Sequence, residues 1–248
     1  LFVSAQWFDY VSMEALSATR SFVFSRNLVV GSTNTTNPPK SIVFPTFAVV
    51  VGNRFKVSRS SGGALGGVVE LHANSKFALN YVDASDSNYT VAEEYLVYAY
   101  GSAIHIVDNA LQSVSTRIHD SIVLNDDATT YFVVNGNYCL YGRVAIRGDN
   151  DGGGSINYVQ INNNIWASCI VGVLLTNASY VVVKGNIYSY LASTEASGSA
   201  LPVVGEICYG VYVLNYSVVE GNNFVGPNAI TASDTVAREM IRVGTDST

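Results

Sequence analysis

Two pairs of aspartates are the residues of this chain best suited to acid–base chemistry. Asp126 and Asp127 follow one apolar run, and Asp149 and Asp151 follow the next. Glycoside hydrolysis needs two carboxyl groups, about 5–5.5 Å apart in retaining enzymes and about 6.5–9.5 Å apart in inverting ones. If the two runs are neighbouring strands, their ends lie about 4.8 Å apart, and the side chains can reach either separation. The alternative is that these aspartates, followed by Gly152–Gly154, only form turns.

Four tyrosines are the candidates for binding a sugar. Tyr131, Tyr158, Tyr180 and Tyr216 recur at one outward position of a repeat, six residues before its reference asparagine. Rings stacked at strand spacing stabilise a sheet by roughly 0.5–1 kcal/mol per pair, which is a sufficient structural explanation. The functional alternative is a sugar platform or a subunit contact, because tyrosine offers a flat apolar face and a hydroxyl.

The repeat that positions these candidates is a strand-like segment closed by an asparagine. Its clearest copies are Tyr158–Asn164, Tyr180–Asn186 and Tyr216–Asn222. In nearly every copy the residues three and five before the asparagine are apolar, the period of a strand with one buried face. The asparagines of the eight copies are Asn27, Asn53, Asn74, Asn109, Asn137, Asn164, Asn186 and Asn222. A unit recurring at about 20–50 residues indicates a solenoid.

Two further strands per copy complete a coil. One precedes the repeat, as in Ser121–Leu124 and Arg143–Ile146, and a shorter one follows it, as in Ile165–Trp166. Three strands per turn, each paired with its equivalent one coil on, predict an all-β, right-handed, single-stranded parallel β-helix of about eight to nine coils over residues 21–248. The asparagine suits a left-handed turn and can hydrogen-bond to the next coil. Residues 1–20 are expected to be a lead-in or cap, with a short helix over Val11–Thr19.

Insertions and the end of the chain complete the predicted organisation. The widest spacings lie between Asn74 and Asn109 and between Asn186 and Asn222, and the second carries Glu195 and Glu206, which we add to the glycan-binding candidates. Loops of a solenoid often gather on its binding face. Residues 239–246 resemble a ninth repeat with Asp246 at the asparagine position, so we expect the chain to be a fragment of a longer protein.

The coils resemble the pectin-lyase-like β-helix superfamily, in which an asparagine ladder lines one turn, and within it the tailspikes of bacteriophages. The resemblance covers roughly residues 21 to 226 and is one of architecture, since the catalytic motifs of pectinases and a calcium-binding repeat are not recognisable. It implies a homotrimer located on a virion tail, or otherwise outside the cell, with a bacterial surface polysaccharide as partner.

Composition narrows the function classes. Charged residues are 13% of the chain, hydrophobic residues 48%, and the net charge is −6, with the basic residues scattered, so we expect no nucleic-acid partner. No apolar run approaches the roughly 20 residues of a membrane span, so we expect no membrane insertion. The three histidines are dispersed, and we expect no cofactor or metal. Cys139, Cys169 and Cys208 are interpreted as small core residues.

Three functions remain open from the sequence. The first is a viral tailspike or tail fibre that recognises, and in some forms depolymerises, a bacterial polysaccharide during host attachment. The second is a stand-alone secreted polysaccharide hydrolase or lyase of the same fold. The third is a passive surface adhesin, which needs no carboxylate pair. The fold alone does not decide among them, because function depends on the site.

Overall fold

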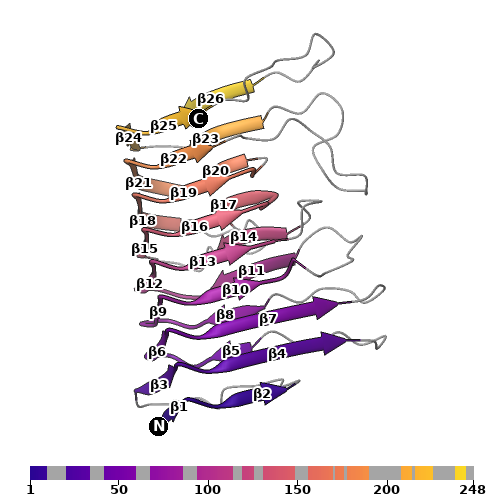
Figure 1. Cartoon of the computed structure of the whole chain (residues 1–248). Helices are drawn as coiled ribbons and strands as arrows, with labels where there is room; N and C mark the ends of the chain where they lie inside the picture. Colours follow the sequence, from indigo (N-terminus) through magenta and orange to yellow (C-terminus); the bar gives the residue numbers. More distant parts are fainter. Residues whose placement is uncertain are drawn as a thin grey trace.

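The chain is an all-β solenoid with parallel strands. The structure, a computed structural model, describes residues 1–9, 21–33, 42–59, 68–85, 94–113, 119–125, 131–148, 156–169, 171–175, 178–189, 208–213, 216–225 and 238–243. Every regular element in these ranges is a strand, and the strands stack in three parallel sheets along one axis (Figure 1). The predicted fold class is therefore confirmed.

Each sheet collects one strand from successive coils. Sheet A contains β1 (Phe2–Ser4), β3 (Phe22–Ser25), β6 (Ala48–Val51), β9 (Lys76–Ala78), β12 (Ile104–Val107), β15 (Phe132–Asn135), β18 (Ile156–Asn162), β21 (Ala178–Lys184) and β24 (Val218–Glu220). Sheet B contains β2 (Trp7–Asp9), β4 (Leu28–Thr33), β7 (Arg54–Arg59), β10 (Tyr81–Asp83), β13 (Ala110–Gln112), β16 (Tyr138–Leu140), β19 (Ile165–Ala167), β22 (Ile187–Ser189) and β25 (Asn223–Val225). Sheet C contains β5 (Ile42–Phe44), β8 (Val69–Leu71), β11 (Glu94–Ala99), β14 (His119–Leu124), β17 (Val144–Gly148), β20 (Val171–Leu175), β23 (Cys208–Val213) and β26 (Arg238–Val243). From β5 onward the chain visits sheets C, A and B in turn.

The core lies inside the coil, where alternate residues of all three sheets meet. In β12, Ile104 and Ile106 are fully buried while His105 between them is exposed, as the period of two predicts. Toward the N-terminal end the core is aromatic, with Phe24 and Phe44 ring centroids 5.3 Å apart. Later coils place Trp166 and Tyr188 at one interior position of sheet B. Stacked side chains thus fill the interior along the axis.

An asparagine ladder runs along the turn between sheets A and B. The Asn137 Oδ1 accepts hydrogen bonds from the Asn109 backbone N–H at 3.0 Å and from the Asn109 Nδ2 at 2.9 Å. The Asn137 Nδ2 in turn donates to the Ile106 carbonyl at 2.8 Å and to the Asn164 Oδ1 at 3.0 Å. The same pattern joins Asn27, Asn53, Asn80, Asn109, Asn137, Asn164, Asn186 and Asn222. Each buried amide therefore stabilises the turn of the coil before it.

The residue before each ladder asparagine has a left-handed backbone. Its φ lies between 54° and 69° in all eight turns, at Arg26, Gly52, Leu79, Asp108, Gly136, Asn163, Gly185 and Gly221. This conformation turns the chain within one residue and allows the next side chain to enter the interior. Four of the eight are glycine, the residue with no steric penalty there.

One ladder position was predicted wrongly. The third asparagine is Asn80, not Asn74, and the step from Asn80 to Asn109 is 29 residues. Asn74 lies in the turn from sheet C to sheet A, where its φ is 59°. In the ladder turn the left-handed residue is Leu79 and not Asn80, whereas Asn74 is itself left-handed. Asparagine is common in turns of both kinds, so residue type alone does not distinguish them. The wide spacing predicted between Asn74 and Asn109 resulted from this error, because the ladder steps on either side of Asn80 are 27 and 29 residues.

At both ends of the described chain the strands differ from those that the sequence predicted. Residues 1–9 supply β1 and β2, and the Gln6 N–H donates to the Asn27 Oδ1 at 3.0 Å, so the ladder begins one coil earlier. The helix expected over Val11–Thr19 lies outside the described residues. At the other end, β26 pairs with β23 in sheet C. Residues 239–243 are therefore not the strand that leads to a ladder position, and that expectation was wrong; Asp246 lies outside the described residues.

Candidate functional site

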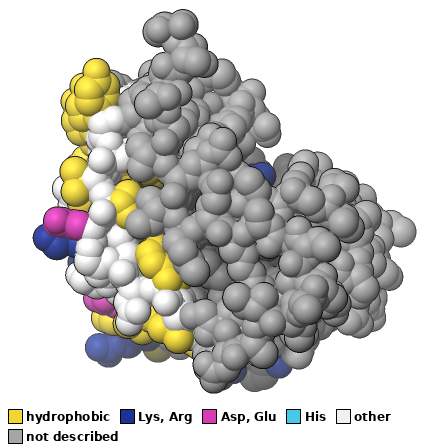
Figure 2. All heavy atoms as spheres, turned by 90° about the horizontal axis from the view of Figure 1, so that it is seen from above, with side chains coloured by type: hydrophobic (Ala, Val, Ile, Leu, Met, Phe, Trp, Pro, Cys, Tyr) yellow, Lys and Arg dark blue, Asp and Glu magenta, His cyan; other side chains and the backbone are white. Residues whose placement is uncertain are grey.

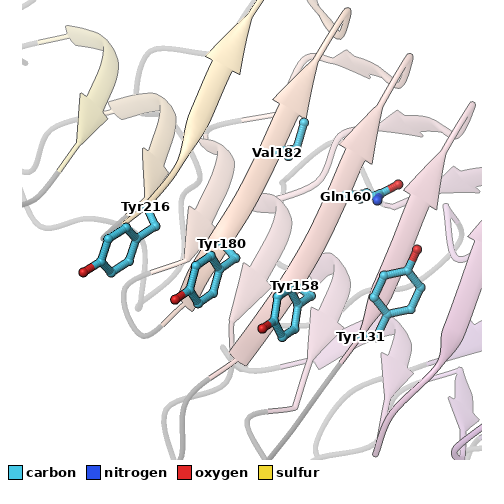
Figure 3. A pocket seen from close by; sticks show the side chains of 6 residues that line it. All are labelled: Tyr131, Tyr158, Gln160, Tyr180, Val182 and Tyr216. Atoms are coloured by element: carbon cyan, nitrogen blue, oxygen red, sulfur yellow. The ribbon is translucent and has the colours of Figure 1, made fainter.

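Three of the four predicted tyrosines form an exposed stack on sheet A. The rings of Tyr158 and Tyr180 lie 5.1 Å apart between centroids at an interplanar angle of 12°, and those of Tyr180 and Tyr216 lie 5.2 Å apart at 11°. In-register pairing of β18 with β21 and of β21 with β24 places the rings one above another (Figure 3). Each ring presents its edge and hydroxyl outward, while the faces between neighbours are covered.

The backbone at these tyrosines is unusual for aromatic residues. Tyr158, Tyr180 and Tyr216 have φ values of 56°, 55° and 52°, in the left-handed region. The same position is left-handed at Phe47, Asn74 and Ala103, so the bend belongs to the coil and not to the tyrosines. A bulky residue is disfavoured in this conformation. Tyrosine in three successive coils therefore suggests that the side chain has a role beyond forming the bend.

A trough runs along the tyrosine stack. Its volume is about 290 Å³, and it is lined by Tyr131, Tyr158, Gln160, Tyr180, Val182 and Tyr216. Gln160 and Val182 are paired residues of β18 and β21, and each is the next outward residue after its tyrosine. All six side chains are uncharged. Seen from above, the described side chains are mostly hydrophobic or uncharged, and an acidic group lies beside a basic one at the edge (Figure 2). The trough suits a neutral ligand that has both apolar faces and hydroxyls.

Tyr131 does not continue the stack. Its ring lies 6.2 Å from the ring of His105, between centroids, at an interplanar angle of 58°. Figure 3 shows the Tyr131 hydroxyl turned along the sheet, away from the direction of the other three hydroxyls. The prediction treated the four tyrosines as one ladder, and the structure divides them into a stack of three and a single ring.

The predicted catalytic aspartates fall outside the described residues. Asp126 and Asp127 are in the segment between β14 and β15, and Asp149 and Asp151 are in the segment between β17 and β18. Both segments connect sheet C to sheet A, where Tyr131 directly precedes β15 and Tyr158 is the third residue of β18. The separation of the carboxyl groups stays a prediction.

The predicted acidic loop also falls outside the described residues. Glu195 and Glu206 are in the segment between β22 and β23, which connects sheet B to sheet C. The tyrosine column, which consists of Tyr131, Tyr158, Tyr180 and Tyr216, lies close to the start of the sheet A strands, after the connections from sheet C. The two sets of glycan-binding candidates therefore belong to different connections of the coil.

A histidine and glutamate pair on sheet C was missed in the sequence. The His72 Nε2 lies 3.0 Å from the Glu70 Oε1, and the Tyr100 ring lies 5.3 Å from the imidazole between centroids. Glu70 and His72 are alternate residues at the end of a strand, which places both on one face and was the available signal. A carboxylate that orients an imidazole is a common arrangement for moving a proton.

A second charged cluster has a buried centre. Asp120 is fully buried, and its Oδ1 and Oδ2 accept hydrogen bonds from Arg143 Nε at 2.8 Å and Arg143 Nη2 at 2.7 Å. The Arg147 Nε lies 3.0 Å from Asp120 Oδ2. The Val144 N–H also donates to Asp120 Oδ1 at 3.3 Å. The carboxylate is enclosed by its partners, so the cluster joins β14 to β17 and leaves no open face for a substrate.

The described part of the chain contains all three cysteines. Cys139 and Cys169 are buried free thiols, as predicted, and burial raises the pKa of the Cys139 thiol well above its usual range. Cys208 lies in β23. Within the described ranges no three metal-binding side chains come together, and no helix is long and apolar enough to cross a membrane.

Comparison of the chain with protein-family models, with curated proteins and with solved structures found no match in any of the three.

Proposed function

We propose that this protein binds a bacterial surface polysaccharide, which lies in the trough of sheet A and runs parallel to the solenoid axis. The observation that supports the proposal is the exposed stack of Tyr158, Tyr180 and Tyr216, with ring centroids 5.1 and 5.2 Å apart. This spacing is comparable to the length of one sugar residue in an extended chain. Successive sugar residues would therefore meet successive tyrosine hydroxyls.

The chemistry of the trough favours a neutral glycan over other polymers. Its lining combines phenol hydroxyls, one amide and one aliphatic side chain, which together suit the hydroxyls and C–H groups of a pyranose. The net charge of −6 disfavours a polyanion such as a nucleic acid. Tyrosine also contributes contact area at low cost in conformational entropy.

The biological setting that we propose is a virion tailspike or tail fibre, a homotrimer that attaches to its host through this surface. The trimer is implied by the resemblance of the coils to bacteriophage tailspikes. The mass in solution distinguishes the settings: a stable trimer supports the tailspike, and a monomer that cleaves soluble glycan supports the secreted hydrolase or lyase.

Binding to a panel of purified capsular and O-antigen polysaccharides tests the recognition. We expect at least one to bind, and Tyr180→Ala to weaken that binding by about tenfold, the loss typical of a central aromatic contact. Tyr138→Ala is the matched control, because Tyr138 is an exposed tyrosine of sheet B outside the trough. If no polysaccharide binds, or if both variants bind as the parent does, the proposal is wrong.

The same panel tests for depolymerisation. Release of short oligosaccharides of defined size would indicate an endo-acting glycosidase or lyase, and Asp126→Asn and Asp149→Asn should then abolish release while binding persists. Release that survives both changes would exclude the aspartate assignment. Binding without products would leave recognition as the function, as in an adhesin.

A further inference from the structure

The end of the trough at Tyr131 differs from the rest of it. Gln160 of β18 pairs with Val133 of β15, and Val133 pairs with His105 of β12, so these three residues form one outward column. Tyr131 belongs to the neighbouring tyrosine column, yet its ring lies against His105. The Tyr131 ring therefore leans from the tyrosine column toward the column of His105, Val133 and Gln160, which forms the floor of the trough.

The exposure of the rings agrees with this arrangement. Tyr131 is the least exposed of the four, at 37%, although no other tyrosine stacks on it, whereas Tyr216 at the other end of the stack is 76% exposed. The Tyr131 hydroxyl points along the sheet toward the side where Gln160 lies (Figure 3). Tyr131 is the lining residue nearest the N-terminal end of the trough, and His105, which is not a lining residue, packs against its ring; we call this ring and the histidine beside it the wall.

A sugar ring cannot enter the stack itself. Carbon atoms in contact lie about 3.5–4.0 Å apart, so a ring held between two aromatic faces needs these faces about 7–8 Å apart. The ring centroids in the stack lie only 5.1 and 5.2 Å apart. A glycan is therefore confined to the trough along the ring edges, and at Tyr131 it meets the wall.

We infer that the trough binds the end of a glycan chain, with the terminal sugar residue stopped by Tyr131 and His105. This inference rests on the proposed glycan binding. From Tyr131 to Tyr216 the trough spans three coil steps of about 4.8 Å each, which accommodates about three sugar residues. Tyr131 is then the residue that determines specificity for a chain end.

The occupant of the closed end is a neutral terminal pyranose. The Tyr131 ring offers it an apolar contact, and the Gln160 amide, exposed on the floor, offers a donor and an acceptor to its hydroxyls. Among the described residues, the six that line the trough are uncharged, so none of them neutralises a terminal uronic or sialic acid.

The dependence of affinity on chain length tests the inference. The probe is neutral O-antigen oligosaccharides graded from about four to about twenty sugar residues, with affinity expressed per mole of chain. A chain has one end of each kind at any length, so we expect the molar Kd to stay within about twofold across the series. A trough that binds internal segments would instead give a molar Kd that falls roughly tenfold, in proportion to the number of sites.

Variants of Tyr131 identify the wall. Tyr131→Ala should open this end of the trough, so that the molar Kd falls with chain length. Tyr131→Phe keeps the ring, so its molar Kd should stay constant with chain length, as in the parent. Tyr138→Ala is the control with unchanged behaviour, and an unchanged thermal midpoint shows that the fold persists. A parent Kd that already falls with length, or a Tyr131→Ala variant with a flat profile, overturns chain-end binding but not glycan binding. Failure of every oligosaccharide and polysaccharide to bind overturns both.

Discussion

Asp120 is the buried carboxylate at the centre of a cluster with two arginines. It is fully buried and is held by Arg143 and Arg147, so its removal would leave two arginines without their carboxylate. Loss of one partner from a buried ion cluster costs about 3–5 kcal/mol. We expect Asp120→Ala to lower the free energy of unfolding by about that amount in a denaturant titration.

The exposed pair of Lys184 and Glu220 provides the comparison. Their charged atoms lie 2.6 Å apart, closer than the shortest contact of Asp120, but both side chains are more than half exposed. Exposed ion pairs contribute about 0–1 kcal/mol. Glu220→Ala should therefore change stability by less than about 1 kcal/mol, and a loss as large as that of Asp120→Ala would show that burial is not the cause of the difference.

The asparagine ladder acts at the scale of the coil. Asn137→Ala would remove the acceptor of the Asn109 N–H and of the Asn109 Nδ2, and the donor to the Ile106 carbonyl. The Asn109 Nδ2 still donates to the Phe77 carbonyl at 2.9 Å, so the Asn109 N–H and the Ile106 carbonyl are the two groups that lose their bond. A buried polar group left without a partner costs about 1–3 kcal/mol, so we expect a loss of about 2 kcal/mol or more. Asn222→Ala should cost less, because that position is partly exposed and water can replace the lost bonds. Equal losses from both changes, measured by denaturant unfolding, would contradict this account.

The turn between sheets A and B offers a matched pair of glycines. Gly136 and Gly52 have φ values of 69° and 67°, so alanine is similarly strained at both. A Cβ at position 136 would also collide with the Asp108 carboxylate, whereas at position 52 the nearest atom is the Arg26 Cγ at 3.9 Å. We expect both variants to lose about 1 kcal/mol from backbone strain, with Gly136→Ala losing more if Asp108 cannot move aside. Thermal midpoints of the two variants check the order.

At the scale of the whole molecule, two buried acids predict how stability depends on alkaline pH. Burial raises the pKa of the Tyr188 hydroxyl above its usual range, and it does the same to the Cys139 thiol. In the unfolded chain these groups ionise near pH 10 and pH 8.5. Above these pKa values the unfolded chain releases protons that the folded state retains. The contribution of the two groups to the free energy of unfolding is therefore fully present below the unfolded pKa values and is lost as the pH rises above them.

Tyr188→Phe isolates one of these contributions. Above about pH 10 the parent should lose about 1.4 kcal/mol more per pH unit than the variant, because one ionisation is removed. Urea titrations between about pH 8 and pH 11 measure the slopes. Equal slopes in the parent and Tyr188→Phe would show that Tyr188 is not the group concerned.

The sequence by itself determined the class of fold and most of the ladder. An apolar residue at every second position, followed by a left-handed turn and an asparagine, is a local pattern, and local patterns specify strands and turns. It predicted the strands around Ser121–Leu124, Arg143–Ile146 and Ile165–Trp166, which belong to sheets C and B. It also predicted that Tyr158, Tyr180 and Tyr216 lie in one column, because equivalent positions in successive coils must align.

Only the tertiary structure decided which residues meet between coils. Asn74 and Asn80 both suit a left-handed or turn position, and pairing with Asn53 and Asn109 selects Asn80. Tyr131 has the same sequence position as the stacked tyrosines, but its ring packs on His105. Register and ring orientation depend on neighbours about 20–35 residues away in the chain, which a local pattern does not specify. The closed end of the trough follows from that packing.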